Sequence, residues 1–178
     1  MKLKKTRIIS VICIFILCFI FHFVYEIMPN TLTSIFFPVN ESIWEHIKLV
    51  YTSIIFYGFI DYIILKKFNI KFNNFFTSLF LSGITTILLF FIIYLPIYNI
   101  IGTKFIINIL VMLFIIILSQ IISYYILKMT KYKNINFISL LLIMTSFVIF
   151  AYLTYYPPKN NLFYDVKDKI YGINTYDI

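Results

Sequence analysis

Five long apolar segments dominate this 178-residue chain and constrain its fold more than any other feature. Each has roughly the 20 residues that an α-helix needs to cross a hydrocarbon core of about 30 Å. They cover residues 8–25, 43–65, 75–94, 105–127 and 136–155. Their apolar residues occupy every face instead of alternating, as they would in the strands of a membrane barrel. The sequence therefore predicts an all-α integral membrane protein, a bundle of five transmembrane helices.

The overall composition excludes a soluble globular domain. Hydrophobic residues make up 62% of the chain and charged residues only 12%, against about 45–50% and about 25% in typical soluble domains. The first apolar segment follows a basic stretch, 2–7, as in a signal peptide, but it is too long and no small-residue cleavage site follows it. We therefore expect this segment to be retained as the first helix.

The distribution of positive charge predicts the orientation of the helices. Ten of the 15 Lys and Arg residues lie before the first segment, between the second and third, or between the fourth and fifth. Cytoplasmic connections of membrane proteins carry such an excess, so we predict the N-terminus inside and the C-terminus outside, in a bacterial cytoplasmic (inner) membrane. The net charge of +8 is spread over short loops. We therefore expect the lipid bilayer as a partner and no nucleic acid.

The predicted organisation has two parts, a five-span transmembrane domain over residues 1–156 and an extracytoplasmic tail over residues 157–178. Two consecutive prolines, 157–158, end the fifth helix. The apolar and aromatic stretch 162–164 favours a tail docked on the outer face, where Asp165 could join a site. Five spans leave little room for a sealed pathway within one copy, which makes a homo-oligomer or a membrane-protein partner plausible.

A polar stretch enters the second helix at the predicted outer face, Phe36–Lys48, with the sequence FFPVNESIWEHIK. Ser42 followed three residues later by Glu45 is typical of a capping box at a helix start, and Trp44 fits the aromatic belt of a membrane interface. These structural roles leave most of the charges unexplained. Ionisable groups beside a span usually face a bundle interior or a wet cavity, so we take four residues as catalytic candidates: Glu41, Glu45, His46 and Lys48.

The other histidine of the chain lies at the same predicted face. His22 and Glu26 are four residues apart at the outer end of the first helix. Imidazole and carboxylate are the ligands that Zn²⁺ and similar ions prefer. The candidate metal ligands are His22, Glu26, Glu45, His46 and Asp165. The alternative, which the sequence favours, is a polar network that joins the first two helices, and no cofactor is identified.

A polar stripe follows one face of the second helix. At 100° per residue it comprises Ser42, His46, Ser53, Tyr57 and Asp61. The stripe could line a cavity or a proton path, but packing through hydroxyl groups is the more common arrangement in membranes. Asp61 is the only acid toward the inner side, and we expect it to pair with Lys66 or Lys67 or to accept a hydrogen bond from Gln120.

These motifs also carry a resemblance. The segment 36–48, the preceding His22, Tyr25 and Glu26, and a terminal YPP…LFYD…YGI pattern resemble a bacterial family of small multispanning membrane proteins known only as a domain of unknown function. The resemblance spans nearly the whole chain and implies no activity, cofactor or catalytic residue. One departure is the sequence KNN at 159–161, where a further His is expected, and its absence weakens the metal hypothesis.

Two classes of function follow from these patterns. The favoured one is a non-catalytic membrane protein with a binding, structural or transport-related role and a polar Glu/His site at its extracytoplasmic face. The alternative is an outer-leaflet hydrolase or transferase, metal-dependent in one version, that acts on a lipid or cell-envelope substrate. They differ in whether Glu41, Glu45 and His46 share one pocket.

Overall fold

The computed structural model describes residues 2–102 and 104–173. In chain order the elements are α1 (Leu3–His22), α2 (Val24–Ile27), α3 (Thr31–Phe36), α4 (Ile43–Lys67), α5 (Phe75–Leu89), a π-helical turn (Phe90–Tyr94), α6 (Leu95–Ile101), α7 (Phe105–Lys128), α8 (Lys133–Tyr155), β1 (Tyr164–Asp165) and β2 (Ile170–Tyr171). The two strands pair antiparallel, with Tyr164 opposite Tyr171. The end of the predicted tail, 174–178, lies outside the described residues.

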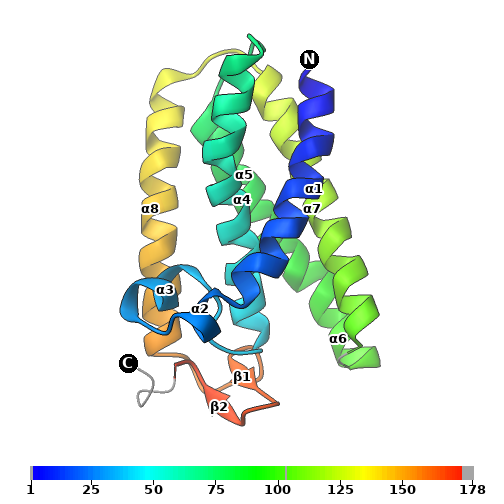
Figure 1. Cartoon of the computed structure of the whole chain (residues 1–178), viewed down its shortest axis with the longest axis vertical. Helices are drawn as coiled ribbons and strands as arrows, with labels where there is room; N and C mark the ends of the chain where they lie inside the picture. The colour runs from blue at the N-terminus through cyan, green and yellow to red at the C-terminus, as the bar shows by residue number, and fades with distance from the viewer. Residues whose placement is uncertain (1, 103, 174–178) are drawn as a thin grey trace.

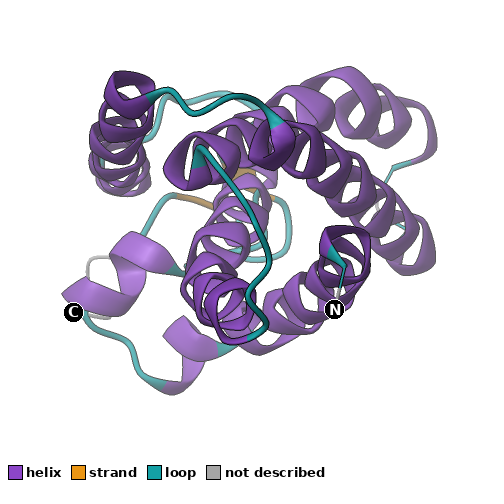
Figure 2. Ribbon diagram, turned by 90° about the horizontal axis from the view of Figure 1, so that it is seen from above, coloured by secondary structure: helices purple, strands orange, loops and turns teal. Residues whose placement is uncertain are grey.

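The prediction of five helices able to span a membrane is confirmed. Within the described part of the chain, five helical stretches are long and apolar enough: Leu3–Ile27, Ile43–Lys67, Phe75–Ile101, Phe105–Lys128 and Asn134–Tyr155. They run side by side, lengthwise in Figure 1 and end-on in Figure 2. Each is longer than its predicted segment, most of all the first, which includes the basic turn 3–7, and the third, which continues past Tyr94 through Pro96 to Ile101.

Two of the spans depart from uniform α-helix. The first is interrupted at Phe23, which separates α1 from α2. In the third, the π-helical turn Phe90–Tyr94 ends two residues before Pro96. Proline has no N–H to give to the carbonyl four residues earlier, and a π-helical turn absorbs the missing bond without ending the span.

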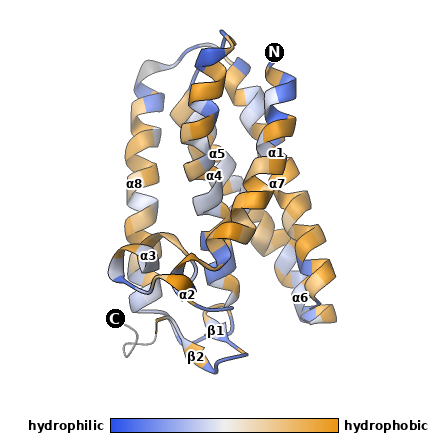
Figure 3. Ribbon diagram, viewed as in Figure 1, coloured by the Kyte–Doolittle hydropathy of each residue, from blue (hydrophilic) through white to orange (hydrophobic). Residues whose placement is uncertain are grey.

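The second span, α4, is the most enclosed of the five. In its membrane window 67% of residues are buried, against 22–33% in the other four, although α4 is the least apolar of them. Its polar side chains are therefore shielded by neighbouring helices, while the apolar faces of the outer helices are exposed, as lipid contact requires (Figure 3). Close packing depends on Gly83 of α5, where a Cβ atom would lie 2.5 Å from a ring carbon of Tyr51 of α4.

The two ends of the bundle differ in character. The N-terminal residues 2–7 and the connections 68–74 and 129–132 lie together at one end, called here the basic end. At the opposite end, α2, α3, the connection 37–42 and the β1–β2 hairpin cover the helix ends (Figure 1). This covered end contains both histidines of the chain.

Candidate functional site: a His–Glu cluster and a buried ion pair

His22, Glu41 and His46 meet at the covered end, and we call them the His–Glu cluster. His22 is the last residue of α1, Glu41 lies in the connection before α4, and His46 is in the first turn of α4. A single carboxylate oxygen, Oε2 of Glu41, lies 3.5 Å from Nε2 of His22 and 3.6 Å from Nε2 of His46. One ligand atom from each of the three residues lies within 4.8 Å of the others.

The orientation of the His46 ring determines which of its nitrogens faces the Glu41 carboxylate. Nδ1 of His46 lies 2.9 Å from the carbonyl oxygen of Ser42, which can only accept, so Nδ1 carries a hydrogen and donates it. In the neutral ring, Nε2 then holds a lone pair that faces the Glu41 carboxylate. Two lone pairs repel at this distance, and a cation between them, either a proton or a metal ion, removes the repulsion. The geometry of the cluster therefore suits a positive charge between these groups.

Glu41 is ionised in this setting. Its contact with His22 lowers the pKa of the Glu41 carboxyl to about 2; partial burial opposes the shift and the nearby His46 adds to it. The Glu41 side chain is 39% exposed and each imidazole 28% exposed, so the cluster is open to solvent on one side. It offers one carboxylate and two imidazoles as ligand groups.

A second polar group lies beneath the cluster and is fully enclosed. Glu45 and Lys48 of α4 form an ion pair at 2.5 Å, with side chains 1% and 0% exposed. The Lys48 ammonium has three protons, and the other two go to the carbonyl oxygen of Ser34 and to Oγ1 of Thr154, each at 2.9 Å. Every donor of this buried Lys48 ammonium is therefore satisfied.

The Glu45 carboxylate is equally occupied. Oε1 accepts from the Thr154 hydroxyl at 2.8 Å, and Oε2 accepts from the backbone N–H of Val39 at 3.1 Å as well as from Lys48. The pair thus ties α4 to α3, to the connection 37–42 and to α8. Glu45 and Lys48 are catalytic candidates from the sequence, yet among the described residues their polar side-chain atoms bond to protein groups inside this network.

The C-terminal hairpin holds the connection that bears Glu41. The buried Asp165 carboxylate accepts from the backbone N–H of Glu41 at 2.8 Å and from those of Lys167 and Asp168 at 2.7 and 3.2 Å. The Trp44 backbone N–H donates to the Leu162 carbonyl at 3.0 Å. Asp165 therefore serves as an anchor for backbone amides, and its three hydrogen bonds in the described part of the chain go to backbone N–H groups and not to an imidazole.

Replacing Asp165 is expected to release the hairpin. Asp165→Ala leaves three backbone N–H groups without their acceptor, which we expect to lower the free energy of unfolding by about 2 kcal/mol and to expose the chain beyond Pro157 to protease. Limited proteolysis and thermal unfolding in detergent measure both effects. The matched control is Asp168→Ala, an exposed acid of the same hairpin. Equal behaviour of the two variants would contradict the anchoring role.

Three sequence expectations about this end need correction. The capping box at Ser42 is formed only in half: Oγ of Ser42 accepts from the Glu45 N–H at 3.4 Å, but the Ser42 N–H donates to Asn40 because Glu45 is engaged with Lys48. Trp44 is 9% exposed and packs against Phe150 and Phe163, inside the bundle and not in an interfacial belt. Glu26 lies in α2, exposed, and is not one of the three clustered residues.

Asp61 of α4 also has a different partner from those expected from the sequence. Its carboxylate pairs with Arg7 of α1, not with Lys66 or Lys67. The same Arg7 guanidinium donates to Ser123 at 2.9 Å and to Gln120 at 3.4 Å, both on α7. Arg7 is thus the centre of a three-helix contact between α1, α4 and α7.

Several partners in the covered end could not be found from sequence. Thr154 lies more than 100 residues from both Glu45 and Lys48, and an isolated Thr at the end of an apolar segment carries no distinctive pattern. The sequence analysis counts Glu41 among the catalytic candidates but not among the metal ligands, because its distance from His22 depends on how the chain between the first two spans folds. The one sequence feature that pointed to this site was the small number of His, Asp and Glu residues in the chain.

Together, fold and site define a multi-pass helical protein with a solvent-open cluster of two imidazoles and one carboxylate above a sealed ion pair. Residues 1–173 match the model of a family described as "Family of unknown function (DUF6512)", and the chain belongs to this family. The expected membership of a family of unknown function is therefore confirmed. Comparison with the curated proteins and with the solved structures gives no match.

Proposed function

We propose that this protein binds a divalent transition-metal ion, with Zn²⁺ as the best match, at His22, Glu41 and His46, in a non-catalytic role. The observation that carries the proposal is the convergence of two imidazole nitrogens on one carboxylate oxygen, at 3.5 and 3.6 Å. Two ligands on a tetrahedral Zn²⁺, each about 2.1 Å from the metal, lie about 3.4 Å apart. The two distances to Glu41 match this separation, and the three ligand atoms all lie within 4.8 Å of one another.

The surroundings of the ligands support a metal better than a structural proton. Metal-bound imidazoles usually donate their second N–H to a carbonyl or carboxylate, which fixes the ring. His46 makes such a bond to Ser42, and it does so from the first turn of the most buried helix. The ligand position is thus held by the fold, while the partly exposed Glu41 leaves a path for the ion to enter.

The orientation in the membrane completes the proposal. The basic end carries most of the Lys residues, which supports placing it in the cytoplasm of a bacterium and the His–Glu cluster at the extracytoplasmic face. A metal site there would meet ions from outside the cell. The neighbouring residues support binding without catalysis. The polar atoms of Glu45 and Lys48 are already engaged with each other, with Thr154 and with backbone groups.

Metal binding is tested directly with Zn²⁺ on the purified full-length protein. We expect about one Zn²⁺ per chain by calorimetric titration at pH 7.5, and a loss of affinity of about hundredfold or more in His46→Ala and in Glu41→Gln, because each removes one of three ligands. The matched control, Glu26→Gln, removes an exposed acid from the same end and should bind as the parent does.

The pH dependence separates the metal from a proton. Zn²⁺ requires neutral imidazoles, so the affinity should fall as the pH drops from 8 to 5.5. Glu41 contributes nothing to this change, since its pKa of about 2 keeps it ionised throughout. Absence of Zn²⁺ binding at pH 7.5, or binding that survives in both ligand variants, overturns the proposal and leaves a protonated His–Glu contact as the role of the cluster.

A metal-dependent hydrolase or transferase is the second candidate, and one observation favours it. Three protein ligands leave a fourth position of a tetrahedral ion open, as in catalytic zinc sites, and the cluster is open to solvent. Hydrolysis of phosphodiester or carboxyl-ester lipids by the Zn²⁺-loaded parent, but not by loaded Glu26→Gln, would support it with Glu26 as the base. Equal turnover with and without Zn²⁺ would eliminate it.

A further inference from the structure

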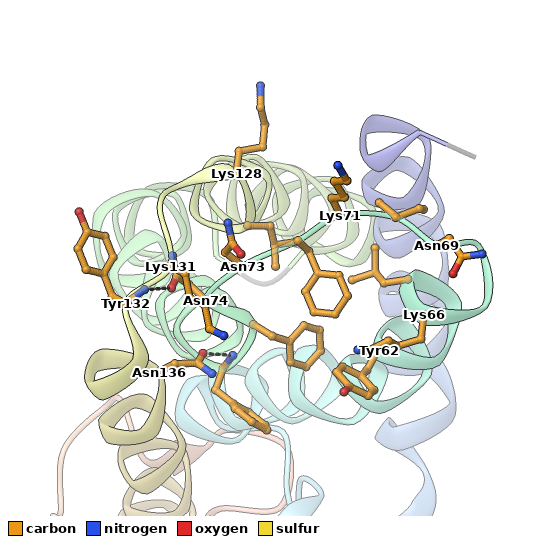
Figure 4. Close-up of a pocket in the computed structure, with 16 residues that line it drawn as sticks. Tyr62, Lys66, Asn69, Lys71, Asn73, Asn74, Lys128, Lys131, Tyr132 and Asn136 are labelled. Carbon is orange, nitrogen blue, oxygen red and sulfur yellow. Dashed lines mark hydrogen bonds between the residues drawn. The ribbon is translucent and has the colours of Figure 1, made fainter.

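A second site candidate lies at the basic end, far from the His–Glu cluster. A cavity of about 850 Å³ opens there between the end of α4, the start of α5, the end of α7 and the start of α8 (Figure 4). The connections 68–74 and 129–132 complete its wall. Neither the family description nor the proposed metal site accounts for this cavity.

Asparagine side chains hold the wall of this cavity in place. Nδ2 of Asn73 donates to the Met129 carbonyl at 2.9 Å, and Nδ2 of Asn74 donates to the Thr130 carbonyl at 2.7 Å. Oδ1 of Asn74 accepts in return from the backbone N–H of Tyr132 at 2.8 Å (Figure 4). The two connections are thus fastened to each other, so the cavity is preorganised without a ligand.

The charge of the lining is entirely positive. Four lysines line the cavity, Lys66, Lys71, Lys128 and Lys131, and no Asp or Glu does. None of the four has an ion pair in the described ranges of the chain. Asp61, the acid on this half of α4, is engaged by Arg7. The Lys128 side chain points away from the hollow, and its ammonium lies 3.4 Å from the Tyr124 hydroxyl (Figure 4). A lining with lysines and without acids favours an anionic ligand.

The floor of the cavity is apolar, which restricts the class of ligand further. Leu65, Phe75 and Leu127 are buried beneath it and form one packed group. Nζ of Lys66 lies 5.6 Å from the ring centre of Tyr62 and 5.8 Å from that of Phe72, so this lysine is held over the aromatic side of the hollow. A ligand that fits carries a negative head and an apolar portion.

We propose that this cavity binds a phosphate-bearing group, and that the anionic phospholipids of the adjoining leaflet supply it. The lysines would neutralise the phosphate, while the glycerol and first acyl carbons lie on the Phe72 and Phe75 surface. Basic pockets between membrane helices hold anionic headgroups in this manner. Tyr62 is 42% exposed and Tyr132 47% exposed, so two amphipathic side chains of the lining are open to the surroundings, as at a headgroup interface.

The test uses the full-length protein in detergent micelles, with bound lipid counted by native mass spectrometry during titration. Phosphatidylglycerol is the anionic probe, phosphatidylcholine the zwitterionic one, and sn-glycerol 3-phosphate the soluble one. The pocket variant is Lys66→Gln/Lys131→Gln. Its matched control is Lys5→Gln/Lys67→Gln, which removes two exposed lysines from the same end that do not line the cavity.

We expect phosphatidylglycerol to bind the parent and the control equally, and the pocket variant about thirtyfold more weakly, because each lysine near a membrane surface contributes about fivefold. Weak phosphatidylcholine binding supports the role of net charge. Glycerol phosphate binding with the same lysine dependence, without phosphatidylglycerol binding, supports the phosphate site and assigns it to a soluble ligand. Equal losses in both variants, or no loss in either, overturn the proposal.

Discussion

Glu45→Gln should lower the free energy of unfolding by about 3–5 kcal/mol, one of the two largest effects of any single substitution that we expect in this chain. The change keeps the size of the side chain, but it replaces one of the two accepting oxygens with an NH2 donor and leaves the Lys48 ammonium buried without a counter-charge. Lys48 is 0% exposed, so water cannot take the place of the carboxylate. Thr154 and the Ser34 carbonyl remain as partners, but neither carries a charge.

The double variant Glu45→Gln/Lys48→Met measures the pair itself. Removing both charges avoids an unpaired buried ion, so the double variant should be more stable than the sum of the two single losses predicts, by at least about 1 kcal/mol. Unfolding in SDS, followed by circular dichroism, gives the four free energies of the cycle. Glu26→Gln/Lys159→Met removes an exposed acid and an exposed base and should stay within about 0.5 kcal/mol of the parent. Additive losses in the buried cycle would refute the coupling.

Arg7→Met should destabilise the protein by a similar amount, about 3–5 kcal/mol, because it strands the Asp61 carboxylate. Asp61 is 1% exposed and Arg7 only 7% exposed, so the pair lies inside the bundle where α1, α4 and α7 meet. Asp61→Asn should cost less, because Arg7 is less completely buried than Lys48 and keeps Ser123 and Gln120 as hydrogen-bond partners. The expected order of stability is parent, then Asp61→Asn, then Arg7→Met.

Thermal unfolding midpoints in one detergent, measured on all variants, test this order. Arg7→Met/Asp61→Leu removes both charges and should recover part of the loss of Arg7→Met. Arg7→Lys is informative as well, because an ammonium cannot reach Asp61 and Ser123 together in the fork geometry of a guanidinium. A midpoint for Arg7→Met within 1 °C of the parent would show that the pair contributes nothing to the fold.

The two ion pairs explain why the least apolar span occupies the middle of the bundle. α4 carries Glu45 and Lys48 near one end and Asp61 near the other, and each charged group needs partners from other helices. Only a central helix can be surrounded by such partners. Because His46 follows Glu45 directly, the same enclosure fixes the helix turn that presents His46 to Glu41. The stability of the bundle and the geometry of the proposed metal site therefore share one cause.

The sequence by itself determined the class of protein and the number of spans. Each apolar segment is long enough to cross a bilayer alone, so this information is local and survives without knowledge of any contact. The scarcity of His and acids likewise singled out His22, Glu41, Glu45 and His46 as residues that need an explanation. The spacing of residues along one helix could not predict which of these four side chains lie together.

Tertiary structure alone decided the partners. Asp61 has Lys66 and Lys67 within one or two turns of α4, yet it pairs with Arg7, because the lysines lie at the exposed helix end and only Arg7 is carried into the interior by the packing of α1. In the same way Glu45 pairs with Lys48 and Thr154, leaving Glu41 to face both imidazoles. Burial makes an unpaired charge costly, and which charges are buried depends on how the helices assemble.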